Sequence, residues 1–109
     1  MPTVTLTLRK PKTTEFKAKV LAAVHASLVA AGVNPNDRFH RIHELDAENF
    51  QYDLTFPDLK QPRTDDFVLI EILLGVGRSV KVKKAILAGL MERVAAEGLD
   101  PENFMVIFQ

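Results

Sequence analysis

Hydrophobic and polar positions alternate with two different periods along the first half of the chain. Residues Thr3 to Leu8 alternate between threonine and an apolar residue, which is typical of a half-buried strand. From Phe16 to Ala31 apolar residues recur every three or four positions, as on one face of a helix that Thr13 or Thr14 can cap. A further strand is expected from Arg38 to Leu45. This half therefore predicts a β-α-β unit.

The second half repeats the same succession of patterns. The run from Phe67 to Leu74 is apolar except for Glu71, which predicts a central strand covered on both faces. Ser79 is a good helix N-cap, and a strand is expected from Phe104 to Phe108. The apolar stripe of the helix between them consists of Val82, Ile86, Leu90 and Val94.

A constant offset of 66 residues relates the two halves. Gly32 and Pro35 then fall on Gly98 and Pro101, and each glycine is expected at positive φ just after a helix. We therefore predict one domain over residues 1–109, built from a pseudo-repeat of 2–45 and 67–109. We expect the connecting loop, 46–66, to run over the surface and to contain one short strand around Tyr52.

Two such units joined through one sheet predict an α+β fold, a tandem βαβ repeat with both helices on one face of a mixed sheet. The opposite face of the sheet then needs cover. A chain of 109 residues has no further element to supply it, so we expect the protein to oligomerise by packing sheet faces together.

Composition narrows the range of partners. Fourteen basic residues balance fourteen acidic ones, so there is no electrostatic reason to expect nucleic acid or an anionic membrane as partner. The chain has no cysteine, and no apolar run approaches the roughly 20 residues of a membrane helix. We expect a cytoplasmic protein that binds a small metabolite or another protein.

Pro2 is the first candidate for chemistry. The initiating methionine is normally removed before proline, which would leave a secondary amine at the start of the first strand. Such an amine is a strong nucleophile and base, and an apolar surrounding lowers its pKa toward neutrality, where it can accept and return a proton. The alternative interpretation is that a Met-Pro start has occurred by chance.

Arg78 is the second candidate, because it lies between the central strand and the second helix. Backbone N–H groups at a helix N-terminus favour anions. A guanidinium can pair with a carboxylate through two hydrogen bonds and can stabilise an enolate as charge develops. The alternative is a surface arginine paired with a neighbouring acid.

Other titratable side chains have weaker claims. Asp37, in the turn before the second strand, could orient water or accept a proton, although Asp is also an ordinary turn former. His25 lies toward the edge of the first helical stripe, and His40 and His43 fall on opposite faces of the following strand. No two histidines have metal-ligand spacing on one face together with a carboxylate as the third ligand. We therefore expect no metal site and interpret each histidine as structural.

Several segments along the chain form a recognisable set. They are Met1-Pro2 opening a strand, Ala22 to His25, Asn36 to Phe39, Phe67 to Ile72 and Gly77 to Ser79. Together they resemble the tautomerase superfamily, above all its malonate semialdehyde decarboxylase branch and related tautomerase-like proteins. The resemblance covers nearly the whole chain and implies a fold like that of macrophage migration inhibitory factor. It also implies catalysis by an amino-terminal proline, a homotrimer whose sheets wrap an interior, and no cofactor.

Roles for individual residues follow from this resemblance. Pro2 matches the catalytic proline, and Asp37 matches the catalytic aspartate of the decarboxylase branch. Arg78 matches the second of two arginines that bind the substrate carboxylate in that branch. His25 matches a helix histidine that assists in cis-3-chloroacrylic acid dehalogenases, which implies a substrate contact.

The first of the two arginines is missing. Val76 stands at its position in the decarboxylase branch, and Gly75 at its position in the dehalogenases. We therefore expect an isomerase, a keto-enol tautomerase acting on a small 2-oxo or 2-hydroxy unsaturated carboxylic acid, with neutral Pro2 as base and then acid. The alternatives are a lyase that decarboxylates a small 3-oxo acid such as malonate semialdehyde, and a non-catalytic trimeric binding module.

Overall fold

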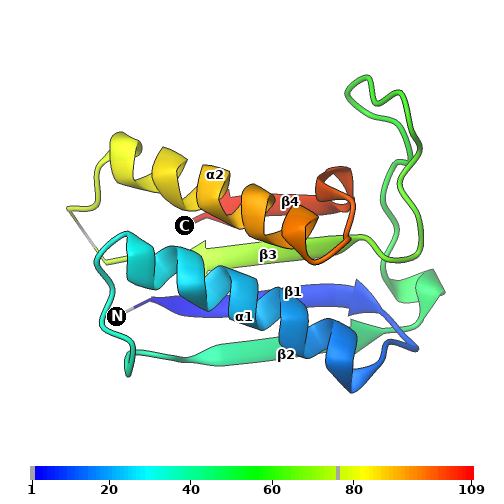
Figure 1. Cartoon of the computed structure of the whole chain (residues 1–109). Helices are drawn as coiled ribbons and strands as arrows, with labels where there is room; N and C mark the ends of the chain where they lie inside the picture. The colour runs from blue at the N-terminus through cyan, green and yellow to red at the C-terminus, as the bar shows by residue number, and fades with distance from the viewer. Residues whose placement is uncertain (1, 76) are drawn as a thin grey trace.

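The computed structural model describes residues 2–75 and 77–109, so the position of the missing arginine at Val76 lies outside the described residues. Each half of the chain forms one strand, one long helix and a second strand (Figure 1). Two short 3-10 helices accompany them. The elements are β1 (Thr3–Arg9), α1 (Thr14–Ala30), β2 (His40–Leu45), η1 (Ala47–Asn49), β3 (Val68–Leu73), α2 (Val80–Ala96), η2 (Pro101–Asn103) and β4 (Phe104–Phe108).

The strands form one mixed sheet in the order β2-β1-β3-β4. The two outer pairs, β1 with β2 and β3 with β4, are parallel, and the central pair, β1 with β3, is antiparallel. Both helices cross the same face of this sheet (Figure 1). The expected α+β architecture with a tandem βαβ arrangement is therefore confirmed.

The helix boundaries follow from their end residues. The hydroxyls of Thr13 and Ser79 each accept a hydrogen bond from the backbone N–H three residues later, over 3.0 and 3.1 Å. After the helices, Gly32 and Gly98 adopt φ values of 107° and 80°, which favour glycine. These four local signals were read correctly from the sequence, and they fix where each helix begins and ends.

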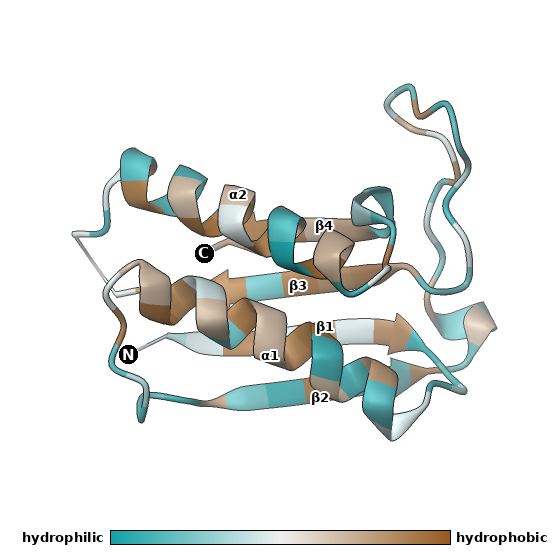
Figure 2. Ribbon diagram, viewed as in Figure 1, coloured by the Kyte–Doolittle hydropathy of each residue, from teal (hydrophilic) through white to brown (hydrophobic). Residues whose placement is uncertain are grey.

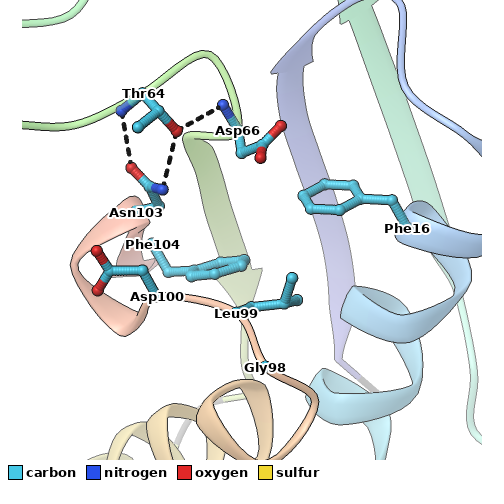
Figure 3. A pocket seen from close by; sticks show the side chains of 8 residues that line it. All are labelled: Phe16, Thr64, Asp66, Gly98, Leu99, Asp100, Asn103 and Phe104. Atoms are coloured by element: carbon cyan, nitrogen blue, oxygen red, sulfur yellow. Dashed lines mark hydrogen bonds between the residues drawn. The ribbon is translucent and has the colours of Figure 1, made fainter.

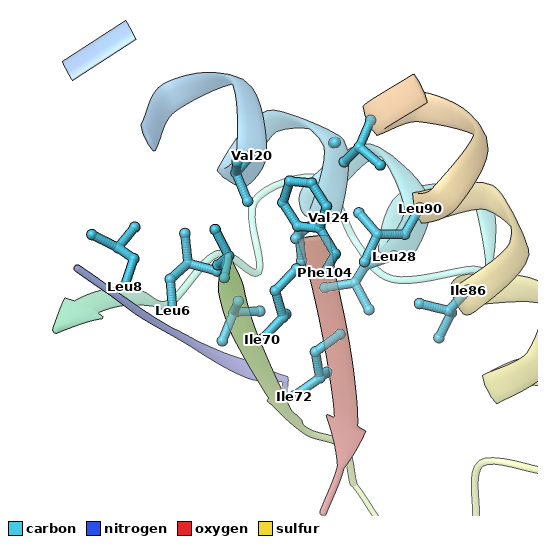
Figure 4. Packing of buried hydrophobic residues seen from close by; sticks show 14 of the residues in the cluster. Leu6, Leu8, Val20, Val24, Leu28, Ile70, Ile72, Ile86, Leu90 and Phe104 are labelled. Atoms are coloured by element: carbon cyan, nitrogen blue, oxygen red, sulfur yellow. The ribbon is translucent and has the colours of Figure 1, made fainter. Parts of the chain in front are cut away.

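The core lies between the sheet and the two helices (Figure 4). Alternate side chains of β1 and β3 point toward the helices, which contribute their apolar stripes. Removing this apolar surface from water is the main stabilising term for such a layer. Its largest fully buried side chains are Leu6, Leu8, Leu28, Ile70, Ile72, Ile86 and Leu90.

The opposite face of the sheet is largely open within one chain. β3 is central, as predicted, but both helices cover the same face of it. On the other face the connecting loop covers one end, where Tyr52 packs on Phe67. On this other face, Leu73 at the end of β3 is 49% exposed, and Met105 and Ile107 of β4 are each 42% exposed. Figure 2 shows the hydrophobic character of β3 and β4 against the mostly hydrophilic β2. We call this surface the open face.

The connecting loop differs from its prediction, because Tyr52 lies in no strand. Its ring packs 4.4 Å from the centroid of the Phe67 ring and beneath the Arg9 guanidinium, and its hydroxyl donates to the Thr64 carbonyl. The adjacent Asp53 carboxylate accepts bonds from two following backbone N–H groups, which turns the chain and lowers the pKa of Asp53. Side-chain contacts therefore fix this segment in place of strand pairing.

The predicted second strand also begins later than expected, at His40 instead of Arg38, since the turn that precedes it extends further. No helix in the described ranges is long and apolar enough to cross a membrane.

Candidate active site

Pro2 lies at the end of the sheet where β1 begins. The backbone N–H of Val4 donates to the Phe39 carbonyl over 2.9 Å, so the segment entering β2 lies beside the segment entering β1. On the other side the last residue of β3, Leu73, pairs with Thr3. The end of α1 and the start of α2 lie at the same end of the molecule (Figure 1). Four segments therefore meet around Pro2.

The Pro2 residue is buried, and strand alternation indicates on which side it lies. Val4 and Leu6 point into the core beneath the helices. Pro2 precedes Val4 by two positions and so belongs to the same face. Its ring is therefore on the helix side of the sheet, at the edge of the apolar core.

Arg78 reaches this region from the start of α2. It follows Gly77, whose φ is 99°, and precedes the N-cap residue Ser79. A methyl group placed on Gly32 would lie 4.0 Å from Nη1 of Arg78, so the guanidinium lies over the end of α1. At this distance a side chain at position 32 would meet Arg78 in ordinary contact, so glycine is required here by its positive φ and not by lack of space.

The Arg78 side chain is exposed and has no carboxylate within ion-pair distance among the residues that the structure describes. The alternative interpretation, a surface arginine paired with a neighbouring acid, therefore has no support there. An unpaired guanidinium beside a helix N-terminus is a ready partner for an anion such as a carboxylate.

Asp37 lies in the turn that leads to β2. Its backbone N–H donates to the Asn34 carbonyl over 2.9 Å, and the Asn34 side chain accepts from the N–H of Asn36 over 2.8 Å. The same turn is fastened to α1, because Nε2 of His25 lies 2.9 Å from the Pro35 carbonyl oxygen. Asp37, which is half-buried, therefore lies in a turn that these hydrogen bonds hold in place.

His25 is buried, with only 6% of its surface exposed. A carbonyl oxygen can only accept, so Nε2 carries the proton toward Pro35 and Nδ1 has a free lone pair in the neutral ring. Nδ1 has no hydrogen-bond partner in the described part of the chain. This nitrogen is buried, so a ligand at the end of α1 would contact it only by displacing the groups that cover it.

His40 contacts His25 edge-on, with ring centroids 5.7 Å apart. Burial, followed by the nearby Arg38 guanidinium and His25, lowers the pKa of His40 below 6.5. His40 is therefore neutral at pH 7. Because His40 pairs with Val4 in the parallel ladder, the two histidines lie next to the start of β1.

A hollow of about 220 Å³ opens at this end of the sheet, toward the open face, and it is lined by none of Pro2, His25, Asp37 and Arg78. The sequence analysis did not predict Phe39 and His40 as site residues, because the length of the turn before β2 could not be read from the sequence. The signal that identifies them is parallel pairing, which brings the first residues of both strands together. The hollow is lined by Thr3, Val4, Phe39, His40 and Arg41.

A second hollow, of about 270 Å³, lies at the other end of the sheet (Figure 3). Its polar groups already have partners: Asn103 exchanges two bonds of 3.0 Å with Thr64, and Asp66 lies 3.6 Å from the Lys12 ammonium. We interpret this hollow as part of the structural contact between the connecting loop and the rest of the domain. Within the described ranges no group of three or more acidic or histidine side chains could hold a metal ion.

Comparison with known proteins identifies the family of this chain. A family model described as tautomerase enzyme matches residues 37–109, and a second model with the same description matches residues 2–55. The chain belongs to the tautomerase family. The predicted resemblance is thereby confirmed, and members of this tautomerase family are enzymes.

Solved structures share the tautomerase fold at low sequence identity. Malonate semialdehyde decarboxylase superposes with a TM-score of 0.86 at 21% identity, over 97% of this chain and 81% of that one. A fused 4-OT, solved as an asymmetric trimer, gives 0.76 at 24% identity, over 98% and 84% of the two chains. No curated protein matches the chain. At such identities the likeness shows the fold alone.

Proposed function

We propose that the protein is a tautomerase that moves a proton on a small 2-oxo or 2-hydroxy unsaturated carboxylic acid. With Met1 removed, the neutral nitrogen of Pro2 takes the proton of the 2-hydroxyl group as the C=O bond forms. The resulting ammonium then gives a proton to the far carbon of the conjugated system, so the amine is regenerated. The observation that carries this proposal is that the buried Pro2 lies at the same end of the molecule as the start of α2, where the Arg78 guanidinium has no acidic partner among the described residues.

Each neighbouring group has a part in this proposal. Arg78 binds the substrate carboxylate and stabilises the enolate oxygen as negative charge develops. Asp37 places the substrate or a water molecule from its fastened turn. His25 contributes the unpaired Nδ1 as an acceptor for a substrate donor that displaces the groups covering it. The burial of Pro2 supports the base role, because burial disfavours the charged form of an amine.

Selective labelling tests the mechanism directly. The protein is exposed to a small carboxylate-bearing electrophile from about pH 5 to 9, and intact mass and peptide mapping follow the modification of Pro2. We expect labelling at Pro2 with a midpoint below that of a free proline peptide, and slower labelling after Arg78→Ala. Retained Met1, or labelling no faster than the free peptide, would remove the mechanism.

Turnover supplies the second test. Pro2→Ala leaves a primary amine at the same place, so we expect lost turnover on 2-hydroxydienoate substrates with the assembly intact. Pro101→Ala, at the opposite end of the sheet, is the control and should keep its activity. Unchanged activity and ligand binding after Pro2→Ala would favour a non-catalytic binding module.

Decarboxylation of a small 3-oxo acid is the second candidate, and the superposition with malonate semialdehyde decarboxylase favours it. In that reaction a protonated Pro2 would polarise the carbonyl group beside Arg78. The two reactions need opposite charge states. Activity that rises with pH through the Pro2 ionisation supports the tautomerase, and activity that falls supports the decarboxylase.

We also propose that three copies assemble into a homotrimer through the open face. The exposed apolar side chains of β3 and β4 support this arrangement, as do the trimers formed by fused 4-OT proteins. Sedimentation velocity tests it, and a stable monomer at micromolar concentration would contradict it.

A further inference from the structure

Two opposite charges lie on the open face among apolar side chains. Glu71 occupies the middle of the central strand β3, and Arg41 lies on the edge strand β2. Both belong to one row across the sheet, because Thr5 of β1 pairs with Arg41 on one side and with Glu71 on the other. Arg41 and Glu71 are therefore aligned across the open face, which they share with Arg9, His43 and several threonine and apolar side chains.

Neither charge has an oppositely charged partner among residues 2–75 and 77–109. Arg41 donates from Nη2 to the Thr5 hydroxyl over 3.4 Å, and Glu71 accepts from the Gln109 side-chain amide over 3.1 Å. Arg9, which also belongs to the open face, already pairs with Asp65 over 2.9 Å. Arg41, by contrast, has no acidic partner among the described residues.

Covering the open face changes the energetics of both groups. In one chain, water reaches the half-buried Glu71 and the exposed Arg41. Packing a second copy on the neighbouring apolar side chains would remove much of this water, and a buried charge without a partner is strongly destabilising. Each charge then needs an opposite charge from the covering surface.

We propose that an ion pair between Arg41 of one subunit and Glu71 of the next sets the register of the assembly. This inference rests on the homotrimer proposed above. Arg41 lies on one edge strand, β2, and Glu71 lies one strand in from the other edge, β4. Such a contact is head-to-tail, and head-to-tail contacts form a ring when their rotation closes, as in the proposed trimer, and an open filament when it does not. Every subunit then donates one arginine and receives one.

Charge reversal tests the pair. Arg41→Glu places two acids on the face and Glu71→Arg places two bases there, so each single variant should weaken association about 100-fold. The double variant carries both changes and should assemble like the wild type. Lys84→Glu and Glu92→Arg make the same charge changes at exposed positions of α2 and should leave assembly unchanged. Sedimentation velocity measures association, and circular dichroism checks that each variant is folded.

Mixing the two single variants separates contacts between chains from a contact within one chain. Each variant carries the charge that the other lacks, so differently tagged Arg41→Glu and Glu71→Arg proteins should associate pairwise although neither associates alone. A ring of three cannot alternate the two variants, so one of its contacts would still join like charges, and the mixed pair is the species to measure. An internal pair would gain nothing from mixing, and absence of the mixed pair would overturn the inference. Single variants that assemble like the wild type would also overturn it. A monomeric wild type would instead refute the homotrimer itself.

Discussion

Ser27 in α1 and Arg93 in α2 lie 66 residues apart in the sequence and contact each other in the structure. Nη1 of Arg93 donates to the Ser27 hydroxyl over 3.4 Å and to the Gly89 carbonyl over 3.2 Å. The Ser27 hydroxyl in turn donates to the Ala23 carbonyl over 2.7 Å. Ala23 and Gly89 are also 66 residues apart, so corresponding positions of the two repeats meet where the helices pack.

Gly89 makes room for this contact, because a Cβ atom at position 89 would lie 2.7 Å from Nη1 of Arg93. Replacing glycine by alanine inside a helix normally stabilises it by about 1 kcal/mol. We expect Gly89→Ala to stabilise the wild type by clearly less, since Arg93 must move and lose its bonds. In an Arg93→Ala background the same change should approach the full gain.

Urea unfolding of the four proteins of this double-mutant cycle, at one protein concentration, measures the coupling between positions 89 and 93. An equal gain from Gly89→Ala in both backgrounds would mean that the Arg93 contacts contribute nothing to stability.

Arg78 should determine substrate binding more than folding. The side chain is exposed, and no carboxylate of the described residues pairs with it, so removing it should leave the free energy of unfolding nearly unchanged. A hydrogen bond to a charged group contributes about 1.5–3 kcal/mol, so Arg78→Ala should lower kcat/KM for carboxylate substrates roughly 10- to 150-fold.

Steady-state kinetics on matched acid and ester substrates measure this effect, since the ester should lose little. Lys81→Ala removes a neighbouring exposed cation from the first turn of the same helix and serves as the control. An equal loss in both variants would point to a general electrostatic effect.

His40 should make stability depend on pH. Burial, with Arg38 and His25, lowers its pKa in the folded chain below the ordinary value of 6.5. Below that pH the unfolded chain binds the proton more readily than the folded chain, so the free energy of unfolding should fall as the pH decreases through 6.5. The fall should end once the pH is below the folded pKa.

Urea unfolding at pH 7.5 and 5.5 measures this difference in the wild type and in His40→Asn, which should show a smaller one. His43→Asn is the control, because His43 is exposed on the open face. If the pH dependence survives His40→Asn intact, another group is responsible.

The helices and most strand positions could be predicted because their signals are local. Thr13 and Ser79 lie next to the N–H groups that they cap, and the alternation from Thr3 to Leu8 records directly which side chains face the helices. The mixed sheet with both helices on one face followed from the repeat of these local units, whereas the order of its strands was not predicted. Tyr52 shows where such reasoning ends: its β-forming residue type was outweighed by contacts with Arg9 and Phe67, which are far away in the sequence.

The candidate site was predicted through residue types, and its surroundings were not. Pro2 and Arg78 attract attention as an amine and a guanidinium with particular chemistry. The position of His40 beside the start of β1 depends on its pairing with Val4, which precedes it by 36 residues. The contact of Arg78 with Gly32 depends on how two helix ends meet, which no local pattern records.

Asp37 and Asn103, again 66 residues apart, occupy equivalent turns. Each donates its backbone N–H to a carbonyl three residues earlier, over 2.9 and 3.0 Å. Asn103 shows that an amide is compatible with this turn, so Asp37→Asn should change the free energy of unfolding by less than about 1 kcal/mol. If the carboxylate takes part in catalysis, the same change should lower kcat/KM by about 100-fold or more.

The reverse exchange is the matched control for this prediction. Asn103→Asp removes the amide that donates to the Thr64 hydroxyl over 3.0 Å at the far end of the sheet (Figure 3). It should therefore cost about 1 kcal/mol of stability and leave turnover unchanged. Urea unfolding and steady-state kinetics on both variants decide between two roles for Asp37. Full activity in a stable Asp37→Asn protein would make Asp37 a turn residue only, and lost activity without lost stability would place its carboxylate in the reaction.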